Sequence, residues 1–171
     1  NGYREAMDHV FEHSKSDFVT FIASDDYIYE DYISNCMGIL NKSKKTIKCF
    51  QSGMWWLNEE GEKVGEKYHD YKTLDEFKRL CMYYSPVNAP TVIYHTSIGS
   101  ALNSAREAHF KNNLTDIGAG DYDMWCGMAD QEIFVYNFRG YLGYYYRWNS
   151  DQCTWKVRKS SVNYDKIIQD Y

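Results

Sequence analysis

The fold class is decided by residues 18–26, which read Phe18-Val19-Thr20-Phe21-Ile22-Ala23-Ser24-Asp25-Asp26. The β-branched and aromatic residues at its start predict a short buried strand over residues 18–22, apolar enough to be central in a sheet. Apolar residues at helical spacing predict amphipathic helices over residues 3–14 and 30–41. A helix, a buried strand, an acidic loop and a helix in this order indicate an open α/β sheet, in which ligands bind beyond the carboxyl ends of strands.

The rest of the chain continues this pattern of helices and strands. We expect strands over residues 46–57, 62–68, 91–94, 133–138 and 141–148, and helices over residues 97–112, 121–129 and 162–170. Thr73-Leu74-Asp75-Glu76 is a capping box, which predicts a helix over residues 74–82. Because neither an internal repeat nor a linker interrupts the chain, we predict one mixed α/β domain over residues 1–171.

The composition excludes some classes of protein. The chain has 171 residues and a net charge of −5, without the basic face that a nucleic-acid-binding protein needs. Its five cysteines form no CxxC pair, and the sequence contains neither a signal peptide nor an apolar run as long as a membrane span. These features predict reduced thiols and a cytoplasmic location. The 17 tyrosines suit a sugar-binding cleft, although composition alone favours a Tyr-rich core and surface.

The adjacent carboxylates Asp25 and Asp26 are the sharpest local signal of chemistry. They follow the predicted buried strand directly, and they repel each other unless a cation or hydrogen-bond donors offset their charge. A hard divalent ion, Mg²⁺ or Mn²⁺, held by one or two carboxylates and by substrate phosphates, would do so. The alternative is a structural one, in which an aspartate caps the helix that follows.

Three blocks of the sequence resemble the family 2 glycosyltransferases of the GT-A fold. Residues 1–8 and 16–26 are similar to the family's N-x-G-x-x-x-A-R-N and D-S-D-D region. Residues 118–125, Gly-Ala-Gly-Asp-Tyr-Asp-Met-Trp, resemble its G-A-E-D-Y-D-L-W block, and residues 145–154 resemble its closing Y-R-x-H-x-x-Q-x-S. The order and spacing of the blocks also fit, and the resemblance extends to about residue 158.

The resemblance implies a GT-A-like, Rossmann-like mixed sheet flanked by helices, and roles for several residues. Ser24, Asp25, Arg147 and Gln152 would contact a nucleotide-sugar donor, and Asp26 with Asp25 would hold Mg²⁺ or Mn²⁺. Asp121 would be the general base that takes the proton of the acceptor hydroxyl, with Asp123 close enough to be the base instead. Direct in-line attack would invert the anomeric centre.

The chain also departs from the family pattern. Ala23 stands in place of the first aspartate of D-S-D-D, Gly120 in place of the glutamate before the base, and Asn149 in place of the closing histidine. The first strands of the nucleotide-binding half would lie upstream of this chain, which would leave a sheet edge uncovered and open to homo-oligomer formation. We therefore expect an N-terminally incomplete GT-A domain whose activity on its own is in question.

The resulting functional prediction is an inverting, metal-dependent glycosyltransferase that moves a sugar from a nucleotide-diphosphate donor to a glycan or lipid-linked acceptor. Surface polysaccharide synthesis at the inner face of the membrane fits this chemistry. The alternative is a non-catalytic, degenerate transferase domain that binds glycan or a partner protein. The spacing His9-Val10-Phe11-Glu12-His13 also matches an inverted zinc-protease motif, but both histidines lie off the apolar helix face, which indicates a chance match.

Overall fold

The computed structural model describes residues 2–43, 46–99, 120–149 and 152. The helix expected over residues 162–170, the predicted helix over residues 97–112 from residue 100 onward, and Cys153 lie outside this part of the chain.

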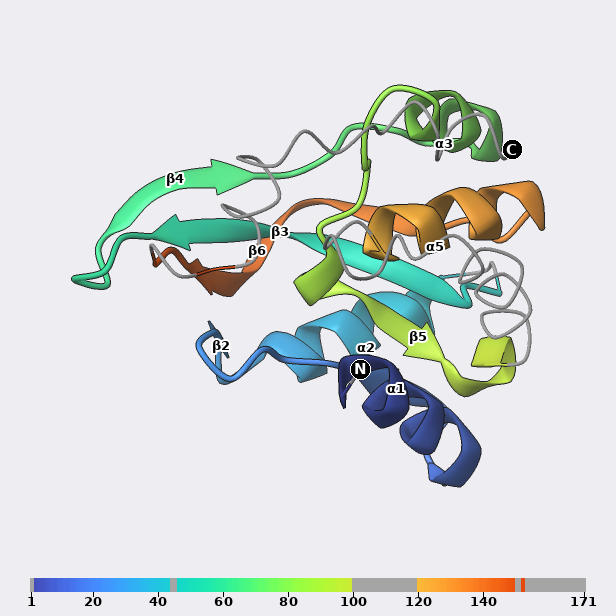
Figure 1. The fold of residues 1–171 in the computed structure, drawn as a ribbon, viewed down its shortest axis with the longest axis horizontal. Helices are drawn as coiled ribbons and strands as arrows, with labels where there is room; N and C mark the ends of the chain where they lie inside the picture. The colour runs from blue at the N-terminus through green and yellow to red at the C-terminus, as the bar shows by residue number, and fades with distance from the viewer. Residues whose placement is uncertain (1, 44–45, 100–119, 150–151, 153–171) are drawn as a thin grey trace.

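A curled mixed sheet and four α-helices make up the described part of the fold (Figure 1). The strand order is β1-β5-β3-β6-β2, with β4 paired to β3, and the β3–β6 pair is parallel while the other pairs are antiparallel. In chain order the elements are α1 (Gly2–His13), β1 (Phe18–Thr20), β2 (Tyr27–Ile28), α2 (Tyr32–Lys42), β3 (Cys49–Leu57), β4 (Lys63–Lys67), α3 (Leu74–Cys81), η1 (Ala89–Thr91), β5 (Ile93–His95), η2 (Thr96–Ile98), α5 (Gly120–Asp130) and β6 (Tyr136–Arg147).

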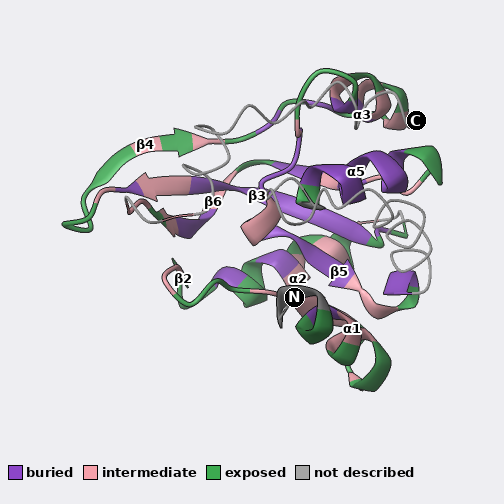
Figure 2. Ribbon diagram, in the orientation of Figure 1, coloured by how far each residue is buried: buried purple, intermediate pink, exposed green. Residues whose placement is uncertain are grey.

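Apolar side chains cover both faces of the sheet, so the fold has three layers. Successive residues of a strand point to opposite faces. Cys49 of β3 and Tyr94 of β5 accordingly join a core formed with α1, α3 and α5, whereas their neighbours Phe50 and Ile93 join a second core formed with α2. Figure 2 shows the buried residues concentrated in β3, β5 and α5.

The first strand corrects one prediction. β1 ends at Thr20 and lies at one end of the described strand order, paired with β5, so it is not central. Its apolar character comes from the helices instead, because Phe18 packs against the α2 core while Val19 packs against the core on the other face. The apolar run therefore indicates that both faces of β1 are covered by other side chains. It does not indicate that β1 is paired with a strand on both edges.

The C-terminal strands correct a second prediction. Residues 136–147 form the single strand β6, where the sequence predicts two strands separated near residue 139. Gly140 has φ +80, which glycine adopts without steric cost, and the strand continues beyond this irregularity. As a result β6 runs beside β3 along most of its length and carries Arg147 to one end of the sheet.

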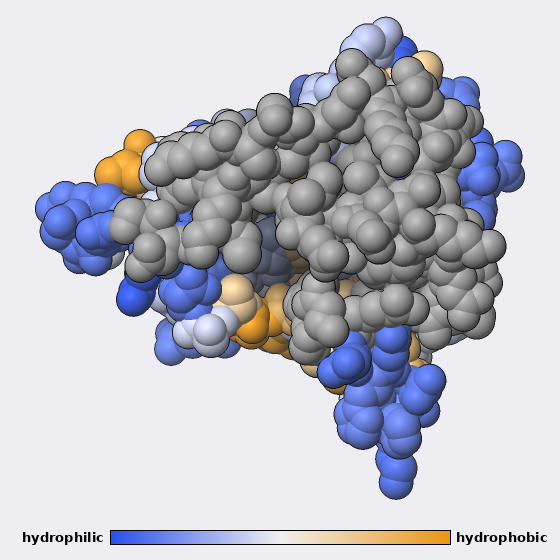
Figure 3. All heavy atoms as spheres, viewed as in Figure 1, coloured by the Kyte–Doolittle hydropathy of each residue, from blue (hydrophilic) through white to orange (hydrophobic). Residues whose placement is uncertain are grey.

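Other predicted elements are confirmed with shifts of a few residues. The capping box before α3 is present, with Glu76 N–H donating to Thr73 Oγ1 at 3.1 Å. Helix α2 buries Cys36 as its spacing predicts, but Ile33 is exposed. The described cysteines are free and buried, and His9 and His13 are exposed, as expected. Hydrophilic side chains cover the tip of the β3–β4 hairpin and the end of α1 (Figure 3).

Candidate active site

The Asp25–Asp26 pair lies in a tight turn between β1 and β2. Asp26 N–H donates to Ala23 O at 3.1 Å and closes this turn, in which Ser24 is exposed and both aspartates are half-buried. The short strand β2 then pairs with the end of β6, with Tyr27 opposite Tyr145. This pairing brings the acidic turn to the end of β6, at the same end of the molecule as the β3–β4 hairpin (Figure 1).

Two donors from β6 bind the carboxylate of Asp26. Tyr144 Oη–H donates to Asp26 Oδ2 at 2.8 Å, and the Arg147 backbone N–H donates to Asp26 Oδ1 at 2.9 Å. The pKa of Asp26 is raised, chiefly by burial and also by the neighbouring charge of Asp25. The hydrogen bonds from the Arg147 backbone and from Tyr144 oppose this rise, because they favour the charged carboxylate. Each carboxylate oxygen keeps a lone pair beyond the one that accepts its hydrogen bond.

Side chains that follow β6 contact Asp25. Asn149 Nδ2 donates to Asp25 Oδ2 at 3.2 Å, and Gln152 Nε2 approaches the same oxygen at 3.5 Å. Gln152 Nε2 also donates to Arg147 O, while its Oε1 is buried without a hydrogen-bond partner within the described structure. Asn149 therefore contributes a hydrogen-bond donor to Asp25.

The guanidinium group of Arg147 lies beside the same turn. Its carbon is 5.9 Å from the centre of the Tyr27 ring, and the residue is exposed. The structure thus brings Asp25 and Asp26 together with Arg147 and Gln152, which follow them by more than 100 positions in the sequence. Ser24 belongs to the same turn, with its side chain toward solvent.

The oxygen atoms of this cluster suit a hard divalent cation. Two carboxylates and the unpartnered Oε1 of Gln152 are the ligand type that Mg²⁺ and Mn²⁺ prefer. The described residues hold no group of three or more His, Cys, Asp or Glu side chains arranged for a metal ion. A cation here would therefore take its remaining ligands from water and from substrate phosphates, as Mg²⁺ commonly does.

Asp121 comes from another element and lies in the first turn of α5. The packing of α5 on α3 places it, with Tyr122 Oη–H donating to Cys81 O at 2.5 Å. Asp121 is exposed and its Oδ1 accepts from the Tyr122 N–H, whereas Asp123 is 8% exposed and faces the core. Of the two candidate bases, Asp121 is the accessible one.

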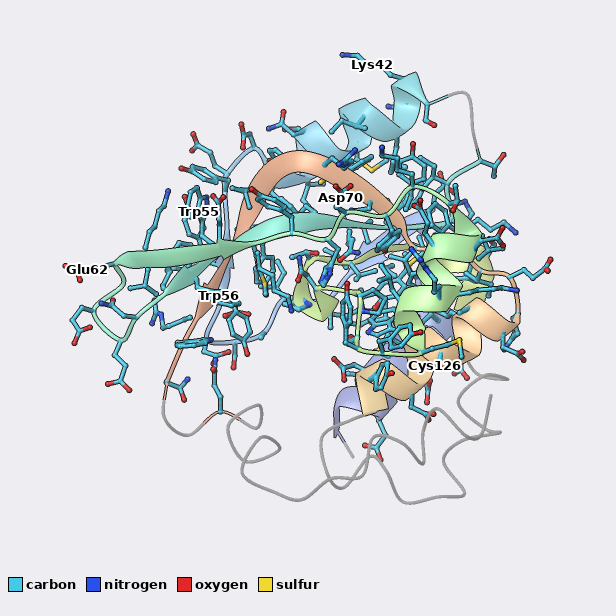
Figure 4. The ribbon with its side chains drawn as sticks, turned by 90° about the horizontal axis from the view of Figure 1, so that it is seen from above. Lys42, Trp55, Trp56, Glu62, Asp70 and Cys126 are labelled. Carbon is cyan, nitrogen blue, oxygen red and sulfur yellow. The ribbon has the colours of Figure 1, made fainter. Side chains whose placement is uncertain are left out.

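Sequence reasoning missed Tyr144, which binds Asp26 directly. The run of tyrosines at residues 144–146 is visible in the sequence, but only the register of β2 against β6 shows which of them contacts Asp26. The side chains of Trp55 and Trp56 are both half-buried and lie on opposite sides of β3 (Figure 4). Trp56 stacks on Trp148 at 5.3 Å between ring centres, and Trp55 lies under Lys63.

Comparison with known proteins supports the fold. No model of a known protein family matches this chain, and no curated protein matches it. Among solved structures, S. aureus TarS (residues 1–349) in complex with UDP-GlcNAc matches with a TM-score of 0.52 and 18% sequence identity. The match covers 95% of this chain and 43% of that one, so this chain spans less than half the length of the TarS structure. In the described residues, no helix combines the length and the apolar character needed to cross a bilayer. The chain thus has a mixed α/β fold that resembles a glycosyltransferase domain.

Proposed function

We propose that this chain is part of an inverting, metal-dependent glycosyltransferase that uses a nucleotide-diphosphate sugar. The observation that carries the proposal is the convergence of Asp25 and Asp26 with Arg147 and Gln152 at the end of β6. Two carboxylates beside a guanidinium group are suited to a cation–diphosphate pair, because the cation neutralises the carboxylates and the guanidinium binds phosphate oxygens. The fold likeness to a protein solved with UDP-GlcNAc supports this interpretation.

The donor's diphosphate is the leaving group in this proposal. Asp25, Asp26 and Gln152 Oε1 would hold Mg²⁺ or Mn²⁺, which when bound would stabilise the negative charge that develops on the diphosphate. Arg147 would donate hydrogen bonds to the same phosphates from the opposite side of the turn. The hydrogen bonds from Tyr144 and the Arg147 N–H favour the charged form of Asp26 and orient its carboxylate for this task.

Asp121 would act as the general base. Its carboxylate accepts the proton of the acceptor hydroxyl while the hydroxyl oxygen forms a bond to the anomeric carbon. The bond between that carbon and the diphosphate oxygen breaks, its electron pair leaves with the diphosphate, and the anomeric centre is inverted. The exposed position of Asp121 suits this role, because a general base must come within hydrogen-bond reach of the acceptor hydroxyl.

The acceptor would be a glycan or a lipid-linked sugar. We propose that the reaction belongs to surface polysaccharide synthesis on the cytoplasmic side of the membrane. Any membrane association would involve residues outside the described part of the chain. The chain could also self-associate through the edge of β1. The position of β1 at one end of the described strand order supports self-association, because an unpaired strand edge can pair with a strand of another chain.

Titration of UDP into the full-length protein by calorimetry, with and without Mn²⁺, tests the donor site. We expect binding that requires Mn²⁺, is lost in Asp26→Ala and persists in Asp31→Ala, which removes an exposed carboxylate whose side chain caps no helix. Absence of binding of UDP and of other nucleotide diphosphates by the folded protein would refute the proposal.

A transfer assay tests the base. Asp121→Asn should lower the rate of transfer by about 10²–10⁴-fold and leave UDP binding unchanged, because it removes the proton acceptor alone. Asp130→Asn, at the other end of α5 and also exposed, is the matched control and should transfer at the wild-type rate. Undiminished transfer by Asp121→Asn would show that another group is the base.

A non-catalytic glycan-binding domain is the second candidate. The observation in its favour is that Ala23 and Gly120 replace acidic residues of the family pattern, which leaves Asp25 and Asp26 as the carboxylates of the turn. The two candidates separate on the calorimetric experiment, because a degenerate domain would bind glycan but would not bind UDP in a Mn²⁺-dependent manner.

A further inference from the structure

An open cleft of about 440 Å³ lies on the side of the acidic turn toward the β3–β4 hairpin. It is lined chiefly by Tyr27, Tyr29 and Tyr145, with Glu30 and Lys63 at its margin. Its volume falls within the range of small-ligand sites, about 300–1,000 Å³. None of the roles proposed above uses this cleft.

The cleft and the Asp26 carboxylate lie on opposite faces of the β2–β6 pair. Adjacent residues of a strand point to opposite faces, so Tyr145 points away from the side on which Tyr144 binds Asp26. Arg147, two positions further along β6, shares the face of Tyr145 and contacts the Tyr27 ring. A ligand in the cleft would therefore lie apart from the acidic turn, with Arg147 between the two regions.

The rings of the cleft are held in fixed positions. Tyr27 and Tyr145 stack with ring centres 4.6 Å apart and planes 23° apart, and Tyr29 lies against Tyr145 at 5.0 Å. The Tyr29 backbone N–H donates to Gly143 O at 3.0 Å, which attaches this residue to β6. Tyr145 is 7% exposed whereas Tyr29 is 43% exposed, so Tyr29 presents its ring to a ligand and Tyr145 supports it.

The charged margin adds polar recognition to the aromatic wall. Lys63 Nζ lies 4.4 Å from the centre of the Trp55 ring, 5.2 Å from Tyr145 and 6.0 Å from Tyr29. Cation–π attraction to these rings orients the ammonium group beside the cleft. Glu30, which also lines the cleft, supplies carboxylate acceptors for hydroxyl groups.

From this geometry we propose that the cleft is a second carbohydrate-binding site, which takes a pyranose unit of the acceptor glycan at a distance from the reacting hydroxyl. Amphipathic tyrosine rings match the C–H faces of a sugar, and flanking donors and acceptors match its equatorial hydroxyls. Lys63 and Glu30 supply a hydrogen-bond donor and an acceptor that a purely apolar ligand would not use. The identity of the glycan as the acceptor rests on the proposed function, whereas carbohydrate binding by the cleft does not.

Carbohydrate binding without nucleotide tests the inference. The full-length protein is titrated with chitopentaose, cellopentaose, maltopentaose and xylopentaose, and binding is followed by saturation-transfer difference NMR. We expect at least one of these oligosaccharides to bind. Tyr29→Ala should raise the Kd of that oligosaccharide about three- to tenfold, whereas Tyr29→Phe should keep the Kd near the wild-type value, because the ring face makes the contact. Lys63→Gln, an exposed position, is a second variant that should also weaken binding.

Tyr83→Ala is the matched control, because it removes a ring that is 75% exposed just beyond α3 and not part of the cleft. Binding of none of the four oligosaccharides overturns the inference, as does a Kd that Tyr29→Ala and Lys63→Gln change no more than Tyr83→Ala does. Failure of the same samples to bind UDP with Mn²⁺, with glycan binding intact and sensitive to Tyr29, would refute the proposed transferase and leave the carbohydrate site standing.

Discussion

The hydrogen bond from Tyr144 to Asp26 gives the sharpest test of how the acidic turn is built. Tyr144→Phe removes the hydroxyl that donates to Asp26 Oδ2 at 2.8 Å and keeps the ring, which is fully buried. A hydrogen bond to a charged group contributes about 1.5–3 kcal/mol to stability. Because Asp26 is half-buried and keeps the Arg147 N–H, water replaces part of this contribution, and we expect a loss of about 1–2 kcal/mol at pH 7.

Thermal and urea unfolding measure this loss. For a chain of this size, about 1–2 kcal/mol corresponds to a decrease in Tm of about 2–8 °C. The hydrogen bond favours the charged carboxylate, so its contribution is present above the pKa of Asp26 and is lost as the pH falls through that pKa. The difference between wild type and Tyr144→Phe should therefore narrow in acid.

The same change would also affect the proposed donor site. The hydroxyl of Tyr144 lowers the pKa of Asp26, so Tyr144→Phe raises that pKa and moves the acid limb of Mn²⁺-dependent UDP binding to higher pH. In the unfolding assay an Asp26→Asn background serves as the control, because the side chain there no longer titrates. A loss of stability from Tyr144→Phe that is as large in this background as in the wild type, or that is independent of pH, would refute the assignment.

The remaining predictions concern packing and helix capping. A methyl group at Gly143 would lie 2.4 Å from Tyr32 Cδ2, so Gly143→Ala should destabilise the fold by about 1–3 kcal/mol in urea unfolding. Gly38→Ala, in a helix position with nothing within 4 Å, should instead stabilise it by about 0.5–1 kcal/mol, and equal effects of the two changes would contradict this packing. Thr73→Ala removes the acceptor of the Glu76 N–H and should cost about 1 kcal/mol in the same assay, with Thr73→Ser retaining most of the stability. A Thr73→Ser variant as unstable as Thr73→Ala would show that the methyl group, and not the cap, is the source of the loss.

Local sequence patterns were sufficient for most elements of this fold. The 3.6-residue spacing of apolar side chains located α1, α2 and α5, and the capping box located α3, because these signals arise within a few residues. The acidic turn after β1 followed from the end of one apolar run. The grouping of Asp25 and Asp26 with Arg147 and Gln152 could be anticipated only from the resemblance to a family, since they are remote in sequence.

Only the tertiary structure shows which strands, distant in the sequence, pair with each other. The apolar residues 18–22 indicate burial on two faces, but a sequence pattern does not tell whether a strand has neighbours on both edges, and β1 is paired with β5 at one end of the sheet. The partnership of Tyr144 with Asp26 depends on the register of β2 against β6, and a shift of one residue would have turned Tyr145 toward the carboxylate instead. The sequence by itself therefore determined which residues are helical, apolar or acidic, because those properties are local, whereas the composition of the site and of the aromatic cleft was decided by a register that joins residues more than 100 positions apart.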